Sequence, residues 1–125
     1  TKSHIFVLMN ISSVDFFSAL AHGTRLRCLM LLVQHDELCV CELTHAIGAA
    51  HPHISRHLAQ LRELGLVSDR REGLWIHYRI HPELPEWVMA VLRATAEGVR
   101  HDGSFAGDER TLSAMPNRPG APKCA

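Results

Sequence analysis

The sequence predicts a mainly α-helical winged helix-turn-helix with a β-hairpin wing, in the order α-α-α-α-β-β-α and acting as a homodimer. Two helical patterns of apolar residues, over 39–47 and 52–64, are separated by a short break and predict the helix-turn-helix. Alternating apolar residues around Glu72-Gly73 predict a hairpin directly after it. A length of 125 residues suits one compact domain of this kind.

The first two helices are predicted over 13–21 and 24–35. Ser12 or Ser13 can cap the first helix, and His22-Gly23 separates it from the second, which Thr24 opens. The apolar face of the first helix suits either the core or a dimer contact. The apolar residues of the two stripes are Val14, Phe16, Phe17, Leu20, Ala21, Leu26, Leu29, Met30 and Val33.

The helix-turn-helix is predicted from a third helix that starts at about Cys39 and a fourth that starts at Pro52. Gly48-Ala49-Ala50 supplies the turn, Pro52 suits the first position of a helix, and Gly65 suits its end. The inward-facing residues of the two helices are Val40, Leu43, Ile47, Ile54, Leu58 and Leu61. The opposite face of the fourth helix carries Arg56 and Gln60, with His53 and Ser55 on its flanks and His57 near the apolar edge.

The hairpin is predicted over 66–71 and 74–81, and a last helix over 84–99. One face of the second strand carries Leu74, Ile76, Tyr78 and Ile80, and the other carries Trp75, His77 and Arg79. Pro82 ends that strand. The wide apolar stripe of the last helix favours a dimer helix, with a core helix as the alternative.

Three domain boundaries follow from composition. Residues 1–11 are expected to be a disordered segment or leftover expression sequence, with Met9 as the natural start. Residues 12–100 are expected to form the DNA-binding and dimerisation domain. Residues 101–125, rich in Gly, Pro, Ser and charge without periodicity, are expected to be a disordered tail.

Composition excludes several classes of protein. The formal net charge is zero, but five arginines lie between positions 56 and 79 and supply a local basic segment. Four cysteines at uneven spacing do not form a secreted disulfide framework. No apolar run suits a membrane span or a signal peptide, so the cytoplasm is the expected compartment. No spacing suggests an activated nucleophile or paired catalytic carboxylates, so we expect no enzyme activity and no organic cofactor.

The predicted architecture indicates double-stranded DNA as the partner. The fourth helix would enter the major groove, where arginine can bind guanine and glutamine can bind adenine. The hairpin arginines would contact phosphate. The predicted DNA-binding residues are His53, Ser55, Arg56, His57, Gln60, Arg70 and Arg71. The alternative from another class is a winged-helix adaptor that binds protein.

Cys39 and Cys41 form a candidate soft-metal site at the start of the third helix. Thiolates select thiophilic ions such as As(III), Sb(III), Hg(II) or Cd(II), and a helix N-terminus lowers the pKa of a thiol. Residues at i and i+2 do not share a helix face. We therefore expect one ion to hold both sulfurs only if the start of the helix unwinds or distorts, which would disturb the recognition helix beside it.

Three segments resemble the ArsR/SmtB family of metal-responsive repressors, and the first is similar to its arsenical-sensing branch. The segments are Glu37–Leu43, Pro52–Leu58 and Arg70–Arg79. The resemblance, over roughly residues 13–100, implies a homodimeric winged helix with its first and last helices at the interface. It also implies binding to a palindromic operator, release by metal, and recognition-helix roles for Ser55, Arg56 and His57.

The sequence departs from that family at three places. Thr44 stands where the arsenical branch commonly has a third cysteine, and Ala50-His51 replaces the usual Ser or Gln before the recognition-helix proline. The last helix has no His between 83 and 100, so the family's zinc site there is rejected. Candidates for a third ligand are Cys124, Cys28 and His45, although a lone Cys28 in a leucine-rich helix is more often a small core residue.

The leading functional prediction is a repressor that As(III) or Sb(III) releases from its operator by binding Cys39 and Cys41. One alternative is a repressor of the same fold that responds to Cd, Pb, Hg or Zn, since adding His45 would suit a harder ion. Another is a redox switch in which a disulfide between the two cysteines releases DNA without metal.

Overall fold

The predicted winged helix-turn-helix is confirmed, with two additional elements. The computed structural model describes residues 11–116. The elements are α2 (Ser13–Leu20), α3 (Gly23–Gln34), β1 (Leu38–Cys39), α4 (Val40–Ile47), α5 (His51–Glu63), β2 (Val67–Glu72), β3 (Trp75–Ile80), α6 (Glu86–Val99) and α7 (Gly103–Ser113). The short strand β1 and the helix α7 were not predicted.

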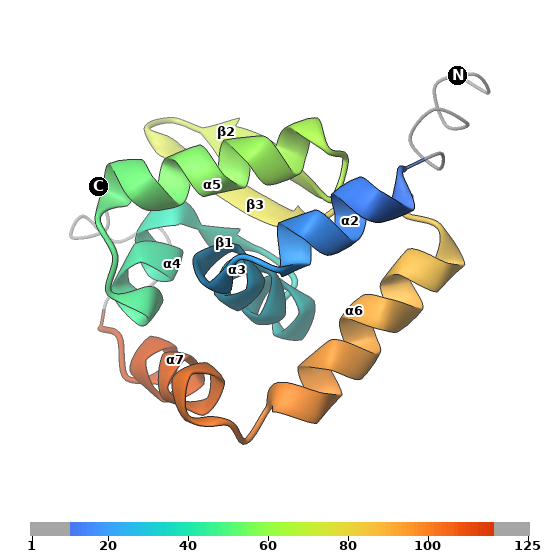
Figure 1. Cartoon of the computed structure of the whole chain (residues 1–125). Helices are drawn as coiled ribbons and strands as arrows, with labels where there is room; N and C mark the ends of the chain where they lie inside the picture. The colour runs from blue at the N-terminus through green and yellow to red at the C-terminus, as the bar shows by residue number, and fades with distance from the viewer. Residues whose placement is uncertain (1–10, 117–125) are drawn as a thin grey trace.

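Helix α3 lies at the centre of the fold, with α2, α4, α5, α6 and α7 arranged around it (Figure 1). Its residues 28–32 are all buried, so this helix is apolar around most of its circumference. The fully buried side chains around it come from every neighbouring helix: Phe16, Leu43, Ile54, Leu58, Leu61, Leu92 and Leu112. One core therefore holds the helix-turn-helix, the flanking helices and the sheet together.

Helices α4 and α5 form the helix-turn-helix. Gly48 ends α4 with φ +80°, a left-handed conformation that costs a glycine little, and its N–H donates to the Thr44 carbonyl at 2.9 Å. Pro52 lies in the first turn of α5, where no intrahelical N–H bond is lost. Ala50 provides no side-chain cap. The start of α5 is therefore held by packing and by the proline instead of a polar cap.

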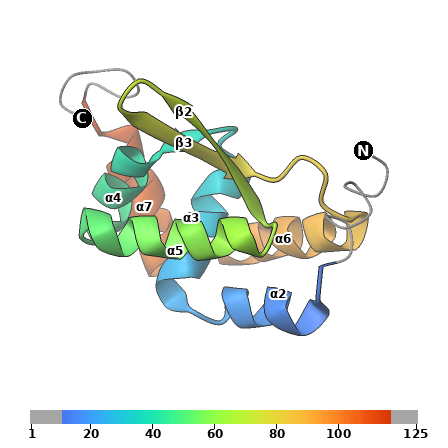
Figure 2. The same cartoon turned by 90° about the horizontal axis from the view of Figure 1, so that it is seen from above.

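The wing is a three-stranded antiparallel sheet in the order β1-β3-β2. In the hairpin, Val67 pairs with Ile80 and Glu72 with Trp75, and β1 pairs Cys39 with His77 on the other edge of β3. The prediction that Leu74 belongs to the strand is wrong, because Leu74 lies in the turn and is 85% exposed. His77, predicted to lie on the outer face, is buried. Figure 2 shows the hairpin extending beside α5.

The prediction that residues 101–125 form a disordered tail is wrong for 103–113, which form α7. Leu112 is fully buried and Phe105 packs against the core, while Asp108 accepts two hydrogen bonds from Arg27 at 2.6 and 2.8 Å. The same Arg27 donates to the Ile47 carbonyl at the end of α4. Arg27 thus links α3, α4 and α7, and this ion pair satisfies a carboxylate that is 3% exposed.

The boundaries predicted for residues 1–10 and 117–125 lie outside the described residues. Between residues 11 and 116, no single helix is long and apolar enough to cross a membrane. Helices α2 and α3 pass that test of length and composition only as a pair, bent by 98°.

Candidate DNA-binding surface and thiol site

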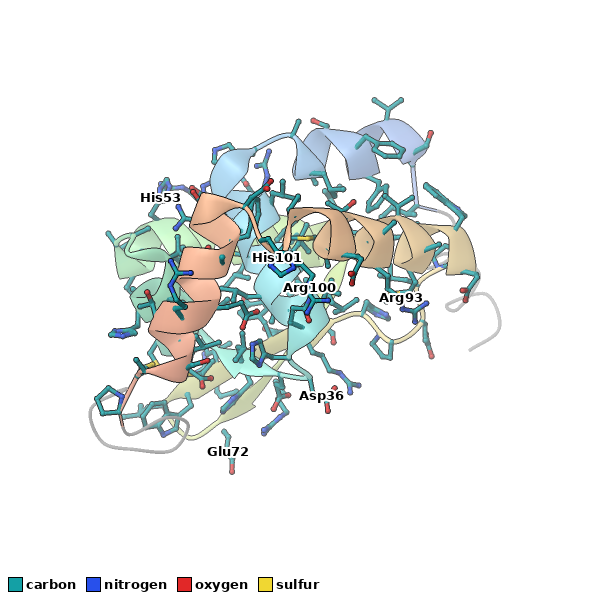
Figure 3. The ribbon with its side chains drawn as sticks, turned by 90° about the horizontal axis from the view of Figure 1, so that it is seen from below. Asp36, His53, Glu72, Arg93, Arg100 and His101 are labelled. Atoms are coloured by element: carbon teal, nitrogen blue, oxygen red, sulfur yellow. A yellow bond between two sulfur atoms is a disulfide. The ribbon has the colours of Figure 1, made fainter. Side chains whose placement is uncertain are left out.

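The exposed face of α5 presents the side chains expected of a recognition helix. Arg56 and Gln60 are exposed, and His53 and Ser55 are partly exposed. The Arg56 Nη2 atom lies 3.4 Å from the His53 Nδ1 atom, so these two side chains form one polar group near the start of the helix. His53 projects from the outside of α5 in Figure 3. This placement suits DNA binding by the first two turns of α5.

His57, predicted to contact DNA, lies instead inside a contact between helices. It is 7% exposed, and its ring packs against the rings of His22 and His53 with centroids 4.4 and 4.5 Å away. Position 57 borders the apolar stripe of α5, and the loop before α3 covers it. His57 therefore positions α5 on α3 rather than facing DNA.

Burial lowers the pKa of His57 below its ordinary value, and the charges of His22, His53 and Arg25 lower it further. The nearby Gln60 side chain opposes this shift. In the unfolded chain His57 takes up a proton near pH 6.5, whereas the folded protein resists protonation.

We predict that the free energy of unfolding falls as pH drops below about 6.5, because the unfolded state then binds a proton that the folded state excludes. Above that pH this contribution to stability is fully present. Urea unfolding of the wild type at about pH 7.5 and about pH 5.5 measures the difference. His57→Gln, which cannot titrate, should reduce it; an unchanged difference in that variant would assign the effect to other groups.

Arg25 is a basic residue beside α5 that sequence reasoning missed. Its Nη1 atom donates to the Gln60 Oε1 atom at 2.9 Å, and its Nε atom donates to the Ala19 carbonyl at 3.3 Å. Gln60 is therefore oriented from α3, a contact across 35 positions that no local pattern reveals. The sequence offered one weak signal, a cation in the first turn of a helix that precedes the helix-turn-helix.

The two hairpin arginines predicted to bind phosphate have different surroundings. Arg70 donates to both carboxylate oxygens of Glu37 at 2.7 and 2.8 Å and to Glu72 at 2.9 Å. The bond to Arg70 is the main reason that the pKa of Glu37 is lowered. Arg71 is exposed and forms no ion pair within residues 11–116. Arg71 is thus the better placed of the two for phosphate, while Arg70 ties the wing to the segment before β1.

Cys39 and Cys41, here called the thiol pair, lie side by side at the start of α4. Cys39 is the N-cap, with extended φ −82° and ψ 161°, and is 1% exposed; Cys41 is partly exposed in the first turn. Their Cα atoms are 5.4 Å apart and their sulfurs form a disulfide. The prediction that the helix begins at about Cys39 is wrong, because Cys39 precedes α4, and the two sulfurs meet while α4 is intact from Val40.

The thiol pair borders both elements expected to contact DNA. A cavity of about 80 Å³ beside it is lined by Cys39, Val40, Cys41, His51, Leu74, Trp75 and Ile76. His51 is the first residue of α5, and residues 74–76 belong to the turn and second strand of the wing. Glu42 holds the local backbone by accepting a hydrogen bond from the Cys39 N–H at 2.8 Å. A change in the position or bonding of the two sulfurs would therefore act directly on residues of α5 and the wing.

Among residues 11–116, no predicted third ligand lies at the thiol pair. Cys28 is fully buried in α3, and burial, the largest cause, raises its pKa to about 12, which disfavours the thiolate. His45 is exposed on α4. Within the described range, no three His, Cys, Asp or Glu side chains converge on one point, so the set of Cys39, Cys41 and His45 is not formed. Cys124 lies outside the described residues.

A helix-turn-helix with an exposed arginine, followed by a hairpin wing, defines a DNA-binding winged-helix regulator. Comparison with known proteins agrees. Residues 22–69 match the model of the family described as "Bacterial regulatory protein, arsR family". The chain belongs to the ArsR family of transcriptional regulators, and it is not an enzyme.

Two relatives illustrate the similarity in sequence. The arsenic resistance transcriptional regulator ArsR1 of Pseudomonas putida is 47% identical over 106 residues, which cover 85% of this chain and 81% of that protein. The arsenical resistance operon repressor of Escherichia coli is 47% identical over 79 residues, 63% of this chain and 68% of that one.

Two solved structures show the same fold. The AntR antimony-specific transcriptional repressor superposes with a TM-score of 0.60 at 31% identity, covering 73% of this chain and 85% of that chain. HlyU from Vibrio cholerae superposes with a TM-score of 0.61 at 30% identity, covering 68% and 88%.

Proposed function

We propose that this protein is a dimeric transcriptional repressor of the cytoplasm that As(III) or Sb(III) releases from a palindromic operator by binding the thiol pair. The observation that carries the proposal is the position of Cys39 and Cys41, adjacent to each other and to both DNA-binding elements. The similar proteins include regulators of arsenic resistance and an antimony-specific repressor, which supports this choice of ion.

The donor set suits a thiophilic metalloid. In the reduced protein, two thiols and arsenous acid condense to a dithiolate of As(III), with the two thiol protons leaving as part of two water molecules. Arsenic keeps its oxidation state, and two As–S bonds replace two As–O bonds. The disulfide form must first gain two electrons and two protons from a thiol reductant before this reaction is available.

Coupling between the thiol pair and DNA is proposed to pass through the sheet and the start of α5. Cys39 pairs with His77 of β3, and Glu37, two residues before it, holds Arg70 of β2. An ion that changes the position of the sulfurs shifts the wing relative to α5. The wing and α5 can then no longer contact the DNA at the same time. A coupling of about 1–3 kcal/mol weakens DNA binding about 5- to 150-fold.

A panel of ions added to the operator complex tests the proposal. Fluorescence anisotropy of labelled operator should show release by arsenite and antimonite under reducing conditions. Release by cadmium, lead, mercury or zinc instead would select the alternative sensor. The absence of operator binding above the non-specific level at physiological salt would favour the protein-binding adaptor.

A second candidate function is a thiol redox switch, and the bond between the two sulfurs favours it. In this case hydrogen peroxide accepts two electrons and two protons from the dithiol, a disulfide forms, and two water molecules leave. Peroxide would then release operator DNA in metal-free buffer, and a thiol reductant would restore binding. Unchanged operator affinity after oxidation would reject this function.

The proposed dimer uses an apolar face formed by α2 and α6. Val14, Phe17 and Trp87 are 75%, 51% and 42% exposed, a concentration of large apolar surface that favours association with a second copy. Phe16 and Trp87 pack edge to face with ring centroids 5.4 Å apart, so the two helices present one continuous surface. The family is typically dimeric, which supports the same arrangement.

We predict that Phe17→Lys converts the dimer to a monomer, because the partner would have to bury an unpaired charge. The dissociation constant should rise by roughly 30-fold or more, equivalent to about 2 kcal/mol. Sedimentation equilibrium measures it. Leu74→Lys, at an equally apolar but separate exposed position, is the matched control and should remain dimeric. A wild type that is monomeric at micromolar concentration would contradict the proposed interface.

A further inference from the structure

The imidazole rings of three histidines lie together where the start of α3 packs against α5, separate from the thiol pair. His57 lies between His22 and His53, with ring centroids 4.4 and 4.5 Å away. His53 and His57 are one helical turn apart on the same side of α5. Their Nε2 atoms are 3.3 Å apart.

The hydrogen bonds decide which nitrogens carry protons. The Arg56 Nη2 atom is always a donor, so the His53 Nδ1 atom beside it at 3.4 Å is the acceptor and the His53 Nε2 atom carries the proton. That N–H donates to the His57 Nε2 atom. The lone pair of His57 therefore faces His53, and its proton sits on Nδ1, a buried atom without a hydrogen-bond partner in the described structure.

We propose that His53, His57 and His22 supply the three protein ligands of a tetrahedral zinc site on α5, with water as the fourth ligand. With Zn–N bonds of about 2.0–2.1 Å, a tetrahedral ion separates two ligand nitrogens by about 3.3–3.4 Å, which matches the observed spacing. Neighbouring ligands of a square-planar copper or nickel ion would lie closer, at about 2.9 Å. The geometry thus favours zinc or cobalt.

Zinc binding requires two small changes. His53 moves its proton from Nε2 to Nδ1, which turns the Arg56 guanidinium away, and the exposed Arg56 side chain has room to move. No three potential ligands already converge within residues 11–116, so His22 must rotate toward the pair. His22 is exposed and makes no capping hydrogen bond at the start of α3, so its rotation breaks none. Zinc at this site would act on the recognition helix independently of any ion bound at the thiol pair.

Zinc titration of a protein without reactive thiols tests the site. The experiment uses neither DNA nor arsenic, so a negative result would reject the zinc site without bearing on the proposed repressor function. The background is Cys39→Ser with Cys41→Ser and Cys124→Ser. Oxidised Cys124→Ser, with Cys39 joined to Cys41, is a second background that needs no substitution within residues 11–116. Calorimetry should show one zinc per chain, and cobalt(II) should give the intense visible absorption of a tetrahedral complex.

His53→Gln and His22→Gln should each weaken zinc binding by about tenfold or more, because each removes one of three ligands. His45→Gln, an exposed histidine on α4, is the matched control and should bind zinc as the background does. The proposal is overturned if neither background binds zinc, if bound cobalt is octahedral, or if His53→Gln binds as tightly as His45→Gln.

Discussion

Replacing both Cys39 and Cys41 by serine should abolish the release of operator DNA by arsenite while operator binding itself persists. Serine keeps the size of the side chain and the N-cap position of residue 39 but removes the soft donor that As(III) requires. The ratio of the operator dissociation constants with and without arsenite should fall from about 5–150 to about 1. Anisotropy titrations under reducing conditions measure both constants.

Cys28→Ala is the matched control for this experiment. It removes a cysteine that is fully buried in α3 and whose raised pKa keeps it protonated, so the response to arsenite should remain. Arsenite release that persists in the double serine variant would remove the thiol pair from the proposed function. A double variant that no longer binds operator would show that the pair supports the DNA-binding geometry instead.

The helix-turn-helix and the hairpin could be predicted because their signals are local. The apolar spacing of Ile54, Leu58 and Leu61 marks one face of a helix, and all three side chains are buried in the core. Glu72-Gly73 marks a turn, and Gly73 has φ +63°, a conformation that favours glycine. These patterns depend only on neighbours within one or two turns.

The features that escaped prediction depend on partners far away in the sequence. Helix α7 has few apolar residues, and one of its anchors is Asp108, whose partner Arg27 lies 81 positions earlier. The burial of His57 depends on His22, and the different surroundings of Arg70 depend on Glu37, 33 positions earlier. The geometry of the thiol pair was predicted wrongly for a local reason. Helix α4 starts at Val40, one residue later than predicted, so Cys39 lies outside the helix.

Arg56→Ala should weaken binding to the operator by about 1–3 kcal/mol, roughly 5- to 150-fold, and relax base preference at one position of each half-site. The reason is that an exposed arginine in the first turns of a recognition helix binds a guanine edge with two hydrogen bonds, which alanine cannot replace. Competition with operators substituted one base pair at a time measures this loss of discrimination.

Arg71→Ala should give a different result, because a contact with phosphate carries no information about base sequence. It should weaken binding to operator and random DNA alike and reduce the slope of log K against log salt by about one. Arg100→Ala, at the exposed end of α6, is the matched control and should change neither property. If Arg56→Ala and Arg71→Ala have the same salt slope and the same base preferences, the proposed division between base-reading helix and phosphate-binding wing is wrong.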